Sequence, residues 1–135
     1  MKRFFDASVL VEACLVQSPK FSVADTLLKT AGAVTSAHAL AEAYATLSGD
    51  ARLKIKAHDA AQMVGDLAEA LQVQALPAKA YRGLIRDAPT RGVSGGSIFD
   101  AIHAAAARES KCVEIHTLNV RHFKHVAPDL TVTGL

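Results

Sequence analysis

The stretch KRFFDASVLVEACLV, residues 2–16, contains the pattern that decides the fold. A short apolar and aromatic run ends at Asp6, and the helix indicated by VLVEACLV follows at once, with Ser8 in position to cap it. The chain therefore opens as strand, turn and helix. The same order returns over residues 33–47, where AVTS is short enough for a strand and Ser36 can cap the helix AHALAEAYATL.

Strands and helices continue to alternate along the rest of the chain. Apolar residues at helical spacing predict helices, and short apolar or alternating runs predict strands, the last of them at a sheet edge. The helices are expected at 21–31, 57–71, 78–88 and from Ser97 onward, with a short helix or turn at 119–126, and the strands at 73–76, 112–117 and 130–135. Parallel strands need crossover connections, which helices supply. The sequence predicts an α/β fold in three layers, with a mostly parallel central sheet flanked by helices, and a single domain over 1–135.

Composition narrows the class of protein without naming a function. Fifteen Lys and Arg against thirteen Asp and Glu leave a formal charge of +2, which is too small to indicate a nucleic-acid partner by itself. Cys14 and Cys112 lack the paired spacing of a zinc or redox site. Asp6 and Glu12 interrupt the apolar stretch near the N-terminus, and no apolar run reaches membrane-spanning length. We expect a cytoplasmic protein with no membrane partner.

Asp6, Glu42 and Asp100 are acids that the predicted fold would bring close together. Each also has a purely structural explanation: Asp6 could end a strand, Glu42 could face solvent opposite the apolar side of its helix, and Asp100 could complete a capping box with Ser97. However, parallel sheets collect ligands at the carboxyl ends of their strands. Asp6 closes the first strand, and Asn119 lies just beyond a later one. The acids therefore predict a site at one rim of the sheet.

The residue types at this rim favour a hard metal ion. Carboxylate oxygens suit Mg²⁺ and Mn²⁺, whose coordination is commonly completed by water and substrate phosphate. A metal held in this way lowers the pKa of its bound water and stabilises charge on a phosphate group. Asp6 and Asp100 are the leading candidate ligands, and Glu42 could bind through a water molecule or act on the nucleophile.

Four segments resemble one family in order and spacing over nearly the whole chain. They are FFDASVLVEA (4–13), SAHALAEAYATL (36–47), GGSIFDAIHAAAA (95–107) and HTLNVRHF (116–123). Together they resemble a PIN domain of the VapC type, the toxin ribonuclease of bacterial toxin–antitoxin pairs. The resemblance implies a metal-dependent endoribonuclease that uses Mg²⁺, with Mn²⁺ as a substitute. It also implies hydrolysis of RNA that leaves a 5′-phosphate and a 3′-hydroxyl.

The resemblance further implies roles for individual residues. It assigns catalysis and metal binding to the acids Asp6, Glu42 and Asp100. It places Ser8, Thr117 and Asn119 in the pocket as supporting polar residues. The family commonly has a fourth acid where this chain has Asn119. The substitution removes one carboxylate that a second metal ion would use as a ligand.

Binding of RNA beside an acidic pocket requires nearby cations, because the carboxylates repel phosphates. Arg121, two residues past Asn119, is the best candidate for a contact with RNA phosphate. His103 lies one turn from Asp100 and could face the pocket, but we expect it on the surface of its helix. None of the two Tyr and five Phe is marked by the sequence as a platform on which RNA bases could stack.

The resemblance also predicts protein partners, and two other functions compete with it. The resemblance implies a small VapB-like antitoxin that occludes the acidic pocket, and a homodimer. A phosphoacceptor receiver domain fits poorly, because such a domain would need adjacent acids early in the chain and a Lys at a late strand end. A non-catalytic PIN-like module that binds RNA or protein through a degraded metal site remains open, and Asn119 is the residue that favours it.

Overall fold

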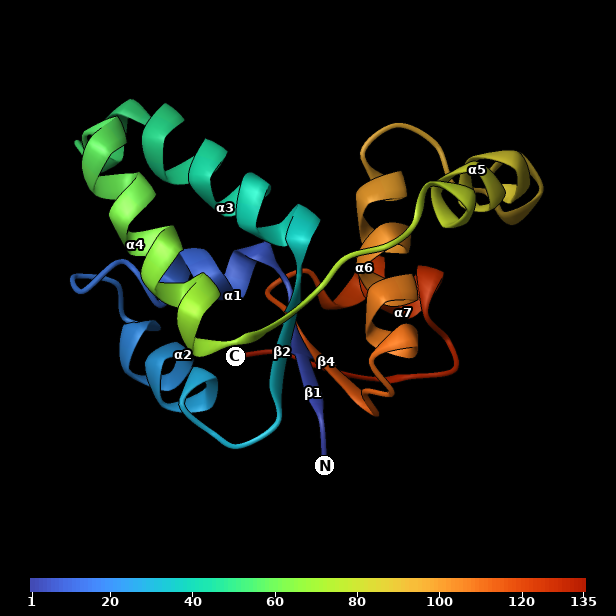
Figure 1. Ribbon diagram of the computed structural model, residues 1–135, viewed down its shortest axis with the longest axis horizontal. Coiled ribbons are helices and arrows are strands. Elements are labelled where there is room, and N and C mark those ends of the chain that lie inside the picture. The colour runs from blue at the N-terminus through green and yellow to red at the C-terminus, as the bar shows by residue number, and fades with distance from the viewer.

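A computed structural model describes all residues from 1 to 135, and it contains one five-stranded sheet (Figure 1). The strands are short: β1 (Arg3–Phe5), β2 (Ala33–Ser36), β3 (Gln72–Gln74), β4 (Glu114–His116) and β5 (Thr131–Thr133). Their order across the sheet is β3-β2-β1-β4-β5, and every neighbouring pair is parallel. The predicted α/β class is confirmed, and so is the predicted edge position of the last strand.

Helices cover both faces of the sheet and complete the three predicted layers (Figure 1). They are α1 (Ala7–Glu12), α2 (Phe21–Leu28), α3 (Ala37–Gly49), α4 (Ala57–Ala70), α5 (Ala78–Asp87), α6 (Ser97–Glu109) and α7 (Val120–Val126), with short 3₁₀ turns at Ala51–Leu53 and Pro89–Arg91. In Figure 1, α1 to α4 lie on one side of the strands and α5 to α7 on the other. The longest helix has 14 residues, and no helix combines the length and apolar character needed to cross a membrane.

Two adjacent phenylalanines show how one strand builds two cores. Successive strand residues point to opposite faces of a sheet. Phe5 packs in the core made with α1 to α4, whereas Phe4 packs in the core that includes Ile115 and Phe123. Both Phe side chains are fully buried. Burial of such a ring stabilises the fold by about 1.5–3 kcal/mol, so FF in residues 4–5 ties both helical layers to the central strand.

The helix starts confirm one predicted cap and correct two others. Ser36 caps α3 as predicted, since its Oγ accepts a hydrogen bond from the Ala39 N–H at 2.9 Å. At α1 the capping residue is Asp6 and not Ser8. At α6 the predicted capping box is wrong: Gly96 precedes the helix, and the Ser97 hydroxyl donates to the Ser94 carbonyl at 2.7 Å. Asp100 therefore has no capping role.

The strand order creates a crevice beside β1. From β1 the chain builds outward through β2 and β3, and it then returns to add β4 and β5 on the other side. Ligands bind at such switch points, beyond the carboxyl ends of the strands. Phe5 lies opposite His116 in the β1–β4 register, so the residues that follow each strand, Asp6 and Thr117, emerge side by side.

Gly32 fixes the approach of the chain to β2. Its φ is +83°, and a Cβ placed there would lie 2.4 Å from the Met1 carbonyl oxygen. The Arg3 N–H also donates to the Gly32 carbonyl at 3.0 Å, which joins the starts of β1 and β2. Only glycine fits this close backbone contact and left-handed conformation.

We predict that Gly32→Ala lowers the free energy of unfolding by more than about 1–2 kcal/mol, because strain and overlap add together. Gly65→Ala is the matched control: this exposed position in α4 has no atom near a new Cβ, and alanine there should add about 0.5–1 kcal/mol. Urea denaturation measures both variants. Equal stabilities would contradict the strain at Gly32.

Candidate active site

Asp6 is a buried carboxylate held by three hydrogen-bond donors. Its residue surface is 3% exposed. The Ser8 hydroxyl donates to Oδ1 at 2.5 Å, the Val9 N–H donates to Oδ1 at 3.3 Å, and the Thr117 hydroxyl donates to Oδ2 at 2.7 Å. Since hydrogen bonds to a charged acceptor are strong, these contacts fix the carboxylate at the start of α1.

The two hydroxyls also accept hydrogen bonds from the loop after β4. Ser8 Oγ accepts from the Leu118 N–H at 3.0 Å, and Thr117 Oγ1 accepts from the Asn119 N–H at 2.9 Å. Both hydroxyls thus connect the β1–α1 and β4–α7 junctions through Asp6. The structure brings Ser8 and Thr117 to Asp6, where the sequence analysis expects them. The Asn119 side chain is exposed at the same rim.

Burial raises the pKa of Asp6 above its ordinary value, although the donated hydrogen bonds from Ser8 and Thr117 act in the opposite direction. Asp100, on the first turn of α6, is half-buried, and its pKa is also raised. Loss of solvent is the main cause; His103 and His122 oppose the shift, while the neighbouring Asp6 and Glu42 carboxylates add to it. In both residues the surroundings disfavour the charged carboxylate, and a bound cation would stabilise that charged form.

Glu42 is held by histidines in this structure. Its Oε1 lies 2.6 Å from His103 Nε2 and 3.4 Å from His38 Nε2. His103 Nδ1 lies 2.8 Å from the Ser36 hydroxyl, whose oxygen also caps α3. With a neutral ring, the network assigns the Ser36 O–H as donor to Nδ1 and the Nε2–H as donor to Glu42.

The surface position expected for His103 is wrong, since the residue is 1% exposed. Its ring packs near Phe4 and Phe123, and it uses both nitrogens in the network with Ser36 and Glu42. The spacing of three residues from Asp100 is the only sequence signal for this role. It does not reveal the partners, which come from another helix.

The predicted metal ligands fit the chemistry of a hard cation but do not form a ready-made cage. Asp6 and Asp100 offer carboxylate oxygens, and their mutual repulsion contributes to the raised pKa of Asp100. However, no three His, Cys, Asp or Glu side chains converge as ligands of one ion. In this structure Glu42 is instead hydrogen-bonded to His103. Asp6 and Asp100 could hold an ion directly, and Glu42 could reach it through water.

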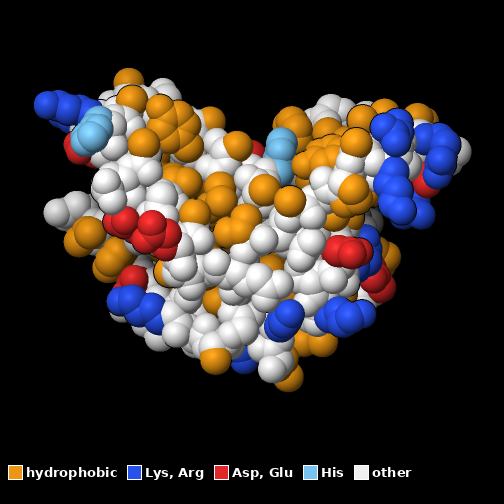
Figure 2. Space-filling model, viewed as in Figure 1, with side chains coloured by type: hydrophobic (Ala, Val, Ile, Leu, Met, Phe, Trp, Pro, Cys, Tyr) orange, Lys and Arg blue, Asp and Glu red, His pale blue; other side chains and the backbone are white.

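Two polar hollows open at the rim. One, of about 670 Å³, is lined by Asp100 with Arg121, His122 and His125. The other, of about 300 Å³, places Glu42 across from Ser8 and Asn119. Figure 2 shows the molecule hollowed between the α3–α4 side and the α5–α6 side, with hydrophobic side chains along the floor. The structure therefore puts Arg121 beside Asp100, where a basic side chain could meet a phosphate.

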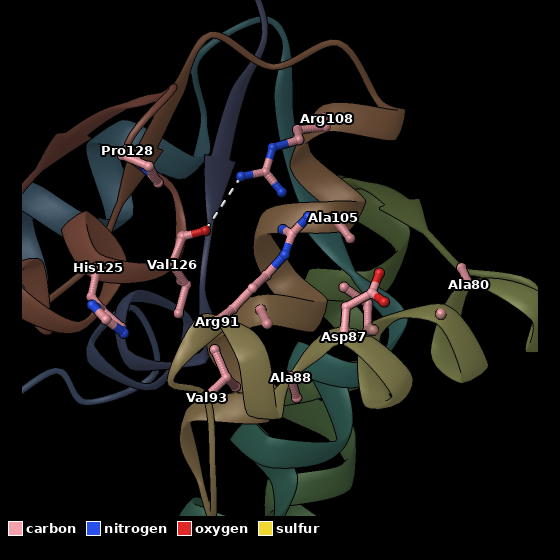
Figure 3. Close-up of a pocket in the computed structure, with 13 residues that line it drawn as sticks. Ala80, Asp87, Ala88, Arg91, Val93, Ala105, Arg108, His125, Val126 and Pro128 are labelled. Carbon is pink, nitrogen blue, oxygen red and sulfur yellow. Dashed lines mark hydrogen bonds between the residues drawn. The ribbon is translucent and has the colours of Figure 1, made fainter.

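A third pocket, of about 490 Å³, contains none of the predicted site residues (Figure 3). It is formed by α5, the turn after α5, α6 and the end of α7, with Val93 and Val126 among its apolar lining. Arg108 closes one part of it by donating to the Val126 carbonyl at 3.4 Å, and it also pairs with Asp129. Because this pocket contains none of the acids of the rim, we assign the chemistry to the rim.

A parallel α/β sheet with a buried acid, Asp6, at the carboxyl end of its central strand, and with Glu42 and Asp100 on the flanking helices α3 and α6, defines the class of this protein. Its sequence matches the PIN domain family over residues 3–128, so the chain belongs to that family. Members are typically nucleases that use a divalent metal. This confirms the family to which the four sequence motifs point. No curated protein sequence matches the chain.

Solved structures with the same fold include three from bacterial toxin–antitoxin systems. VapC20 of Mycobacterium tuberculosis, named as a toxin that cleaves the sarcin-ricin loop, has a TM-score of 0.68 and 19% identity over 84% of this chain and 87% of that chain. VapBC2 of Rickettsia felis, solved with a DNA fragment from its promoter, has a TM-score of 0.69 and 19% identity, covering 100% and 99%. VapBC-1 of nontypeable Haemophilus influenzae has a TM-score of 0.64 and 17% identity, covering 99% and 98%. At these identities the likeness establishes the shared fold.

We predict that Asp100→Asn, in chelator near neutral pH, unfolds at a higher urea concentration than the parent. The raised pKa means that the charged carboxylate opposes folding there, and the amide removes that charge. As the pH falls through the raised pKa of Asp100, the parent carboxyl becomes neutral and the difference should vanish.

Asp129→Asn provides a control of opposite sign. The hydrogen bond from Arg108 lowers the pKa of Asp129, so the charged form stabilises the fold and the amide should weaken it slightly near neutral pH. An Asp100→Asn protein that is less stable than the parent in chelator would show that this carboxylate serves the fold.

Proposed function

We propose that residues 1–135 form a single PIN domain that acts as a metal-dependent endoribonuclease toxin of the VapC type. The observation that carries this proposal is the Asp6 carboxylate, buried at the switch point of the sheet and clasped by Ser8 and Thr117, with Asp100 within electrostatic reach. A structural role alone would not require two acids whose pKa values are both raised.

The three acids have different roles in this proposal, according to the residues that surround each of them. Asp6 and Asp100 would hold Mg²⁺, or Mn²⁺ in its place, since Asp6 is fixed by hydrogen bonds and Asp100 is half-buried at the same rim. When bound, the ion would supply Lewis-acid stabilisation of the scissile phosphate and a more acidic water. Glu42, fixed by His103, positions the attacking water and accepts its proton. Thr117 keeps the second oxygen of Asp6 oriented.

Arg121 counters the repulsion between the acidic rim and RNA. It lines the hollow that contains Asp100 and is itself exposed, as a group that meets a phosphate must be. Such a contact positions the strand without reading its sequence. We assign Arg121 to the phosphate next to the cleaved bond.

A non-catalytic PIN-like module that binds RNA or protein is the second candidate. It is favoured by the hydrogen bond that ties Glu42 to His103, by the lack of three converging ligands, and by Asn119 in place of a fourth acid. Such a module would keep its fold and its basic contacts but would cleave nothing.

Cleavage of a mixed RNA by purified protein separates the two candidates. We expect cleavage with Mg²⁺ or Mn²⁺ and none in chelator. Asp100→Asn should nearly abolish it, because an amide cannot supply the anionic oxygen that a divalent ion prefers. Mn²⁺ at about a hundred times its Kd should stabilise the parent by about 2.7 kcal/mol and the variant by less.

Asp25→Asn is the matched control, since Asp25 is paired only with Lys29 on the surface of α2, and this variant should cleave like the parent. Metal-independent cleavage, or no cleavage by a parent that binds RNA, would favour the non-catalytic module.

Partners follow from the same proposal. Two of the similar structures are VapBC proteins, which supports a small VapB-like antitoxin for this chain, bound over the acidic rim. We also propose a homodimer through α5. This amphipathic helix has no buried residue, Ala80 and Leu84 on it line the apolar pocket of Figure 3, and Ile85 is 61% exposed. An apolar helix face of this kind is stabilised when a second copy covers it.

Ile85→Arg should convert the dimer to a monomer, because the charge would lose solvent at the contact. Val23→Arg, at an exposed position of α2, should remain dimeric and controls for surface charge. Sedimentation of the parent and both variants at micromolar concentration gives the result. A monomeric parent would contradict the dimer.

A further inference from the structure

An exposed aromatic ring stands next to the acids of the rim. Phe99 precedes Asp100 on the first turn of α6, and 42% of its surface is exposed. One side of the ring stacks on His38, with ring centres 5.0 Å apart and planes 24° apart. His38 lies on the first turn of α3, one turn before Glu42. The stacked pair therefore joins the two helices that carry Glu42 and Asp100.

His38 gives the Phe99 ring a fixed backing. Its Nε2 lies 3.4 Å from Glu42 Oε1, and its ring is tilted against the buried ring of His103, with centres 5.7 Å apart. Because His38 covers one face of Phe99, the exposed area of Phe99 belongs to the other face and the edge. A flat apolar surface is thus held open to solvent beside the candidate metal ligands.

We propose that Phe99, backed by His38, is the platform on which an unpaired RNA base stacks next to the cleaved phosphate. This inference rests on the proposed ribonuclease function and adds a base-binding residue to that site, which requires an RNA base that is free to leave its neighbours. Aromatic side chains recognise such bases through their faces. A base inside a duplex cannot present its face to Phe99.

The positive charge of Arg121 near Asp100 favours an RNA strand as the ligand of Phe99. Arg121 shares a hollow with Asp100, so a phosphate at Arg121 and a base on Phe99 belong to one strand that passes the acids. Other exposed apolar residues do not combine these features. Ile85 and Val23 are aliphatic and lie on α5 and α2, and Tyr44 is exposed on α3 without a stacked ring.

Phe99→Trp tests the platform directly, because the chain contains no Trp and the new indole is the sole fluorophore of its kind. The variant is made together with Asp100→Asn, which blocks cleavage. A single-stranded oligoribonucleotide of mixed sequence should quench the indole saturably, and the same strand annealed to its complement should quench it much less. Tyr44→Trp with Asp100→Asn is the control, and its emission should not respond to either RNA.

Kinetics on the metal-loaded protein give a second measurement. Phe99→Leu keeps an apolar side chain without an aromatic face, and it should raise KM roughly 5- to 150-fold with kcat retained, the range expected for one stacked base. Phe99→Tyr should restore the parent KM. Thermal melting of both variants checks that they fold.

The outcomes separate the platform from the ribonuclease proposal. Saturable quenching by single-stranded RNA without cleavage by the parent would support the platform and overturn the nuclease. Cleavage by the parent with no quenching, or with KM unchanged in Phe99→Leu, would overturn the platform. If Phe99→Leu instead weakens only the binding of the proposed VapB-like antitoxin, the ring is a protein contact and the platform is overturned.

Discussion

The hydrogen bond between the Thr117 hydroxyl and the Asp6 carboxylate is the contact on which the site depends. It joins residues 111 positions apart in the chain, at the ends of two strands that pair directly. Burial of a charged carboxylate opposes folding unless donors surround it. Ser8, Thr117 and the first turn of α1 provide those donors, so the stability of the β1–β4 junction and the position of the acid have one physical origin.

A second hydrogen-bond network connects helices α3 and α6. His103 connects the cap of α3 at Ser36 with Glu42 further along the same helix, while its own helix α6 begins beside Asp100. A single buried ring thereby fixes the orientation of α3 relative to α6. It also holds the Glu42 carboxylate, so the site combines one carboxylate fixed by hydroxyl groups, Asp6, with one whose direction depends on a histidine.

Much of this architecture was predictable, because strands and helices of this chain follow local patterns. Ser36 before an apolar helical repeat, and Asp6 after FF, place a cap and an acid without knowledge of the fold. Tertiary contacts decided the remainder. The Ser97 hydroxyl bonds to Ser94 in a loop that has no periodic signal, and His103 is buried by residues from other elements. The sequence also could not reveal that Phe99 remains exposed, since that depends on the distance between α3 and α6.

The central position of β1 has a consequence for synthesis of the protein. This strand leaves the ribosome before the other four, yet β4, which pairs with it and is followed by Thr117, is translated more than 100 residues later. Nascent β1 can pair early only with β2. Cotranslational folding thus leaves Asp6 without its second hydroxyl, and Asp100 without a completed sheet, until β4 and Thr117 have been translated. The topology delays maturation of the acidic rim until strands far apart in the chain have both left the ribosome.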